Sequence, residues 1–188
     1  MALRNTEDRY GWGVQGLHWV TVLGLAGAFV LGFTMVELAM SPTKLKMYSW
    51  HKWLGVCLFG LVLLRLLWRS FNRAPPLPQT VPEWQRRVAT GMHVLLYLLL
   101  LAVPISGWLM SSAKGFPTVL FGLWQLPDAV ARDAVLAERL EWLHFILNKS
   151  LLTLIAVHIA AALKHHFIDR DGVLARMLPL RRKARKPT

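Results

Sequence analysis

The chain has 188 residues, of which 55% are hydrophobic and only 17% are charged, and its mean hydropathy is +0.40. This composition is too apolar for an ordinary soluble domain and indicates a membrane protein. The formal net charge of +12 would also suit nucleic acid, but the basic residues gather at the ends of apolar stretches and in the C-terminal tail. We therefore expect them to contact lipid headgroups, and we expect no nucleic-acid partner.

Four apolar stretches are each long enough to cross a bilayer, which requires roughly 20 helical residues. They cover residues 16–36, 48–68, 88–110 and 142–167. Backbone groups in lipid must be paired within the protein, so the economical architecture is all-α. We predict an integral-membrane, antiparallel four-helix bundle that forms one domain over residues 1–188.

The connections between these stretches differ in composition. Residues 70–84 are rich in proline and cannot continue a helix. The longest connection, residues 111–141, begins with KGFPTVLFGLWQLP, which resembles an interfacial segment. It continues into DAVARDAVLAERLEW, which has the composition of a short surface helix. The single cysteine, Cys57, lies inside the second stretch, so an intramolecular disulfide is excluded.

The basic residues also predict the orientation of the bundle. Most of the 22 lysines and arginines lie near the two termini and in the connection between the second and third stretches. The positive-inside rule therefore predicts that both termini are cytoplasmic. The first stretch is too long for the apolar part of a cleavable signal peptide, so we expect it to remain in the membrane.

Histidines lie at depths that match in pairs. With cytoplasmic termini, His51 and His144 are both near the outer surface, whereas His18 and His158 are nearer the cytoplasm. The interval from His144 to His158 corresponds to about 21 Å of helix rise and puts both on one helix face. Neutral imidazole is a usual axial ligand of haem iron, and two imidazoles leave no vacant position for oxygen. The spacing therefore favours two bis-histidine haems stacked between the membrane surfaces.

Several alternatives stay open on the residues alone. His93 matches the depth of His18 nearly as well as His158 does. The histidines would also suit a metal-transport path, although the stretches contain no carboxylate for a cation, or simple interhelical hydrogen bonds. Arg65 shares a helix face with His51 and lies near the inner pair, where it fits either a haem propionate or a headgroup reached by snorkelling.

The motifs LHW (17–19), HKWLG (51–55), RVATGMHVLLYLLLLAVPISGWLM (87–110) and LHFILNKSLLTLIAVHIAAALKHHFIDRDGVLARMLP (143–179) resemble the bacterial cytochrome b561 family, including its superoxide oxidase. The resemblance covers nearly all of the chain and implies four transmembrane helices with two b-type haems in the bacterial inner membrane. It implies that His18 and His158 ligate the iron of the cytoplasmic-side haem, and His51 and His144 that of the periplasmic-side haem. His93 and His165 match histidines of a ubiquinone site.

The resemblance further implies an enzyme that oxidises superoxide at the periplasmic side and reduces ubiquinone near the cytoplasmic side. The outer side of the chain presents cations that would attract this anion, namely Lys44, Lys46, Lys52 and Lys149. Alternatively, these lysines anchor the protein to lipid headgroups. His165 likewise has an alternative role, as a polar residue at the membrane interface. The rival function is a cytochrome b subunit that serves a partner dehydrogenase or hydrogenase, with a periplasmic partner protein.

Overall fold

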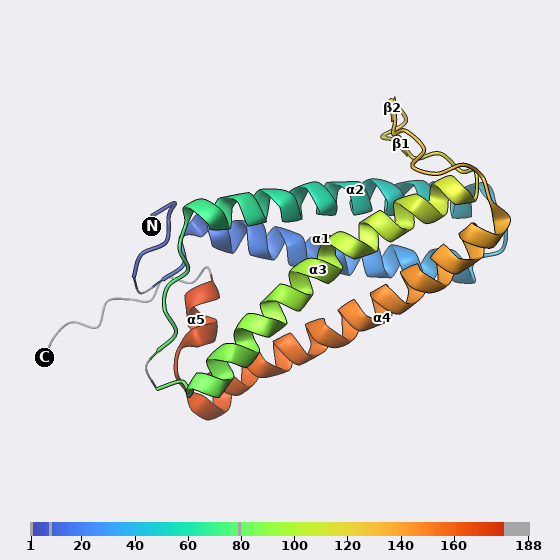
Figure 1. Ribbon diagram of the computed structural model, residues 1–188. Helices are drawn as coiled ribbons and strands as arrows, with labels where there is room; N and C mark the ends of the chain where they lie inside the picture. Colours follow the sequence, from blue (N-terminus) through green and yellow to red (C-terminus); the bar gives the residue numbers. More distant parts are fainter. Residues whose placement is uncertain (1, 8, 79, 179–188) are drawn as a thin grey trace, which may run out of the picture.

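The computed structural model describes residues 2–7, 9–78 and 80–178, and four long helices dominate it (Figure 1). The helices are α1 (Trp12–Glu37), α2 (Pro42–Phe71), α3 (Glu83–Ala113) and α4 (Ala134–Lys164). Each is long and apolar enough to cross a membrane. Successive helices run in opposite directions (Figure 1), which confirms the predicted all-α, antiparallel membrane bundle.

Capping residues explain where two of the helices begin. Ser41 accepts a hydrogen bond from the Lys44 backbone N–H at 3.2 Å, and Pro42 occupies the first turn of α2. Asp133 accepts one from the Leu136 N–H at 2.9 Å and starts α4. Each cap satisfies a backbone donor that has no partner within its own helix.

The helix expected as a separate surface element is instead the beginning of α4. The chain runs as one helix from Ala134 to Lys164, because no proline or glycine interrupts it. Its first turns are held by a small core of Ala113, Ala137 and Leu140. Beyond it follow a π-helical turn, η1 (His165–Asp169), and a short helix, α5 (Val173–Met177).

The predicted range 142–167 therefore runs through α4 into η1, and the other three predicted ranges lie inside α1, α2 and α3. How much of each helix lies in lipid stays a prediction.

The bundle has two ends, which we name by what they carry. At the terminal face lie residues 2–7 and the ends of the four helices at Trp12, Phe71, Glu83 and Lys164 (Figure 1). At the loop face lie their other ends, together with a small antiparallel hairpin of β1 (Val119–Leu120) and β2 (Trp124–Gln125). This hairpin is where the sequence predicted only an interfacial segment.

Polar contacts fasten the short helix α5 to the terminal face. The buried Gln15 of α1 donates its amide to the carbonyl of Arg176 at 3.0 Å, and the Trp19 indole donates to that of Met177 at 3.0 Å. Arg176 donates in turn to the carbonyl of Pro76 at 2.7 Å. The segment after α4 is thereby tied to α1 and to the connection between α2 and α3.

Helix packing is pairwise: α1 lies against α2 and α3 against α4, and α2 also contacts α3. Val62 and Leu151 are fully enclosed, whereas many large apolar side chains face outward, Leu23 being 71% exposed. In a membrane these side chains would contact lipid, which is as apolar as they are, so the hydrophobic effect does not drive the helices together. Close van der Waals packing at the few enclosed positions therefore contributes much of the helix association.

We expect Leu151→Ala to lower the free energy of unfolding by about 2 kcal/mol or more, because it leaves a cavity in a closely packed interface. Leu152→Ala is the matched control, since the neighbouring Leu152 is 37% exposed and faces outward. Unfolding of the detergent-solubilised protein, followed by circular dichroism, measures both variants. Equal decreases in the free energy of unfolding of the two variants would show that Leu151 makes no special contribution to helix packing.

Candidate site of paired histidines

Two histidines from different helices form a pair near the loop face, which we call the loop-face pair. His51 on α2 and His144 on α4 lie within electrostatic range of each other. The Nδ1–H of His51 donates to the carbonyl of Ala28 on α1 at 3.0 Å. That of His144 is shared between the carbonyl of Val103 at 3.1 Å and the hydroxyl of Ser106 at 2.9 Å, both on α3.

These hydrogen bonds decide which nitrogen of each ring carries the proton. A carbonyl oxygen can only accept, so both neutral rings hold their proton on Nδ1 and leave Nε2 with a free lone pair. A metal-binding histidine usually donates its second ring N–H to a carbonyl or carboxylate in this way, which fixes the ring orientation. The loop-face pair is therefore oriented for metal ligation by Nε2.

Two glycines allow these rings to lie against the neighbouring helices. A Cβ at Gly32 of α1 would meet Cε1 of His51 at 3.3 Å, and one at Gly107 of α3 would meet Cε1 of His144 at 3.0 Å. Both separations are shorter than ordinary van der Waals contact. The absence of a side chain at these positions therefore leaves the space that the imidazoles occupy.

A second group of histidines lies towards the terminal face, and we call it the terminal cluster. It contains His18 of α1, His93 of α3, His158 of α4 and Arg65 of α2, all within electrostatic range of His18. The rings of His93 and His158 are in edge contact, with centroids 5.4 Å apart. His93 and His158, the two candidates for the second haem ligand beside His18, thus both lie near it.

Arg65 organises this cluster. Its Nη2 donates to Nδ1 of His18 at 3.0 Å, and its guanidinium carbon lies 5.5 Å from the centre of the Tyr97 ring. The arginine therefore turns inward to the histidines, and the alternative in which it only snorkels to headgroups does not describe this structure. Because Nδ1 of His18 accepts this bond, the proton of its neutral ring lies on Nε2.

The four histidines can be tested against the needs of haem, whose iron takes one unprotonated nitrogen from each side. The loop-face pair supplies two unprotonated Nε2 atoms without any rearrangement. In the terminal cluster, Nδ1 of His18 is occupied by Arg65 and Nε2 carries the proton. Haem would fit there only after Arg65 releases His18, and a released guanidinium would be free to pair with a propionate.

His165 lies apart from the terminal cluster, in the π-helical turn after α4. Its Nδ1–H donates to the carboxylate of Asp171 at 2.5 Å, and the Asp171 side chain is only 5% exposed. The other oxygen of Asp171 accepts the Val173 N–H at 3.0 Å. The carboxylate thus orients the imidazole and leaves Nε2 as the atom that can exchange a proton with a ligand.

His165, Asp169 and Asp171 also lie close enough together to share a metal ion. Lys164 already contributes a cation there, since its ammonium lies 2.6 Å from a carboxylate oxygen of Asp169. Ion pairing thus accounts for the acidic groups, and we assign no metal to them.

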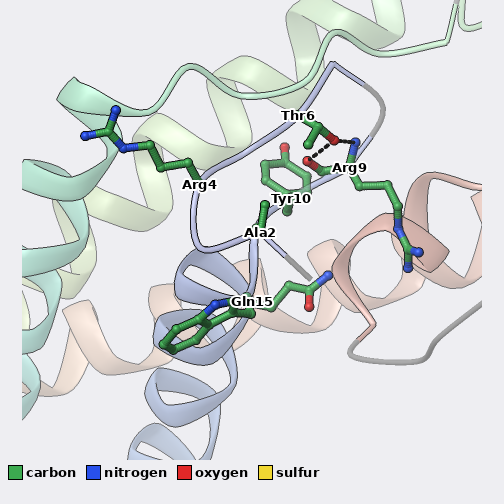
Figure 2. Close-up of a pocket in the computed structure, with 8 residues that line it drawn as sticks. Ala2, Arg4, Thr6, Arg9, Tyr10 and Gln15 are labelled. Atoms are coloured by element: carbon green, nitrogen blue, oxygen red, sulfur yellow. Dashed lines mark hydrogen bonds between the residues drawn. The ribbon is translucent and has the colours of Figure 1, made fainter.

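A small cavity of about 140 Å³ opens at the terminal face, where the N-terminal residues fold over the start of α1 (Figure 2). Its labelled lining residues are Ala2, Arg4, Thr6, Arg9, Tyr10 and Gln15. Burial raises the pKa of the Tyr10 phenol above its usual value of 10, and Arg69 and Arg176 oppose this rise. The phenol is therefore protonated at neutral pH, in a cationic setting that suits an anionic group.

Sequence reasoning did not single out Ser106, Gly32, Gly107 or Asp171 as functional. Ser106 and Gly107 are adjacent small residues in PISGW, within a stretch of large apolar ones. This contrast in size was the sequence feature that could have indicated a close contact at these positions. Asp171 belongs to ALKHHFIDRD, but the spacing does not reveal which carboxylate reaches His165.

Comparison with known proteins agrees with this arrangement. The family model of prokaryotic cytochrome b561 matches residues 9–180. Cytochrome b561 homolog 2 of Escherichia coli K12 is 39% identical over 180 residues, which cover 95% of each chain. Cytochrome b561 homolog 1 of the same organism is 29% identical over 88% of this chain and 94% of the relative. A probable superoxide oxidase CybB of Yersinia pestis is 29% identical over 89% and 94%, respectively.

The family and the four helices fit a protein of the bacterial inner membrane. Because the family match spans nearly the whole described bundle and includes all the paired histidines, the chain belongs to the prokaryotic cytochrome b561 family of membrane electron carriers that use haem b.

Proposed function

We propose that this protein is a di-haem superoxide:ubiquinone oxidoreductase of the inner membrane, with both termini in the cytoplasm. His51 and His144 would ligate the periplasmic-side haem, and His18 and His158 the cytoplasmic-side haem. The observation that carries the proposal is the pair of Nδ1–H bonds that leaves Nε2 of His51 and His144 free for iron. When bound, haem b supplies one-electron transfer.

The proposed reaction balances as two superoxide anions and one ubiquinone. Each superoxide loses one electron and becomes O₂, while the quinone takes up two electrons and two protons to form ubiquinol. The name of the Yersinia pestis relative supports superoxide as the donor. The chain itself must therefore attract an anion at the loop face and deliver protons at the terminal face.

Lys149 is the best-placed cation for attracting superoxide. Its ammonium lies over the rings of Phe33 and Phe145, at 5.5 and 5.3 Å from their centres. Phe33 follows Gly32, the residue against which His51 packs. Lys44 and Lys52 instead donate to the carbonyls of Leu38 and Phe116, so their charges also hold the loop face together.

His165 is the proposed proton donor to the quinone, with Asp171 as the residue that positions it. The carboxylate that accepts the Nδ1–H fixes the orientation of the ring and directs Nε2 away from Asp171. His93 is the second proposed quinone residue, and its edge contact with His158 places it beside a proposed haem ligand.

The purified protein should contain two haem b groups per chain, counted from a reduced-minus-oxidised absorption spectrum. Gly107→Val should remove haem from the loop-face pair, because its side chain occupies the space of the His144 ring. Gly91→Val is the control on the same helix, since a Cβ at Gly91 meets nothing within 4 Å. Full pigment in the Gly107 variant, or colourless normal protein, would contradict the haem assignment.

Lys149→Gln should slow superoxide-dependent ubiquinone reduction by about two-fold at low salt, where the Debye length is about 30 Å, and less at high salt. Arg87→Gln, an equal charge change at an exposed residue of the terminal face, should have little effect. The assay uses enzymatically generated superoxide and protein in nanodiscs. Inertness of the normal haem-loaded protein would instead favour the subunit of a partner dehydrogenase.

Asp171→Asn should reduce kcat for ubiquinone reduction by about ten-fold or more, because an amide can donate as well as accept and no longer fixes which ring nitrogen of His165 carries the proton. Asparagine is as good a helix cap as aspartate, so the turn before α5 keeps its hydrogen bond to Val173. KM for superoxide and the haem content should not change. A fall in haem content that matches the loss of activity would show a structural role for Asp171 instead.

A further inference from the structure

The hairpin at the loop face presents an apolar surface that the proposed electron transfer does not use. Residues 115–127, GFPTVLFGLWQLP, contain no charged side chain. Leu123 is 90% exposed, Trp124 73% and Phe121 56%. Burial of apolar surface is favourable, and adjacent side chains this exposed on one small element mark an interaction surface.

The hairpin lies beside α2, not beyond its end. The Trp53 indole donates to the carbonyl of Val119 at 2.6 Å, and its ring centre lies 5.3 Å from that of Phe121. Trp53 follows the first residue of α2, Pro42, by about 16 Å of helix rise. Figure 1 shows the hairpin displaced sideways from α2 and set back from the end of the bundle.

The surrounding anchors are typical of a boundary between lipid and water. Trp108 of α3 donates its indole N–H to the carbonyl of Pro127 at 3.2 Å, and Lys52 donates to that of Phe116 at 3.0 Å. Tryptophan and lysine with these polar contacts are common where a span leaves the membrane. Trp50, one turn before the α2 tryptophan that contacts the hairpin, is 50% exposed, so the apolar surface of the hairpin continues onto the outward-facing flank of α2.

The turn keeps an aromatic side chain at the tip despite an unfavourable backbone conformation. Phe121 has φ +52° and Gly122 has φ +74°. The first value is rare for a bulky residue, and glycine or asparagine would adopt it more easily. Either replacement would remove the apolar group that the tip now presents.

Backbone pairing limits how deep the hairpin can lie. A two-stranded hairpin leaves N–H and C=O groups unpaired along its outer edges, and such groups are not tolerated in hydrocarbon. The backbone therefore belongs among the headgroups, and only side chains reach the acyl chains.

We propose that residues 118–126 form an interfacial anchor whose Phe121, Leu123 and Trp124 side chains insert into the lipid leaflet at the loop face. The sideways placement, the lack of charge and the continuity with the lipid-facing flank of α2 assign lipid, not a protein, as the occupant. The inference stands whether or not the protein oxidises superoxide.

A spin label tests the anchor directly. Cys57 is the only cysteine, so Cys57→Ser provides a background for Leu123→Cys. In vesicles that contain only phospholipid and the purified protein, the label at position 123 should collide several-fold more with oxygen than with a water-soluble nickel complex. Glu138→Cys, on an exposed turn of α4 at the same face, should show the reverse preference.

Equal nickel accessibility at positions 123 and 138 would overturn the proposal and leave this surface to a protein partner. Haem content and helical circular dichroism equal to the background protein would show that the labelled variants are folded. A third label, at position 23 in place of the outward-facing Leu23 of α1, gives the oxygen preference of a site in the lipid.

Discussion

The structure depends on an imidazole N–H that is donated to a backbone carbonyl of an adjacent helix. In lipid, neither a ring N–H nor an extra carbonyl lone pair finds water, so the pairing is strongly favoured. His51 bonds to Ala28 of α1, and His144 to Val103 of α3. Each bond joins two helices and also fixes the orientation of an imidazole ring. The same interaction thus holds neighbouring helices together and orients the proposed haem ligands.

The two histidine sites are not equivalent. At the loop face, neutral oxygens hold the rings, and both Nε2 atoms are available. At the terminal face, the guanidinium of Arg65 donates to His18, and it also lies near Tyr97 and Tyr10. A cation beside a haem favours its reduced state, because reduction adds negative charge. In the proposed enzyme, this asymmetry would favour electron flow towards the terminal face.

The bundle also carries different groups of side chains at its two ends. The loop face carries Lys149 and the apolar hairpin, whereas the terminal face carries the hydrogen bond of His165 to Asp171 and the ion pair of Lys164 with Asp169. A charge pair needs little protection at a membrane surface but is costly in lipid. The proposed proton transfer would therefore take place at the end of α4, where a π-helical turn brings Asp171 back to His165.

The sequence by itself determined the class of fold, since long apolar stretches in lipid can satisfy their backbone only as helices. It also determined the position of each histidine along its helix, because helix rise is fixed. Tertiary structure alone decided what surrounds each ring: that Gly107 leaves room for His144, that Arg65 bonds to His18, and that Asp171 reaches His165. These contacts join residues from different elements, and their formation depends on helix rotation and side-chain packing, which depth and periodicity do not specify.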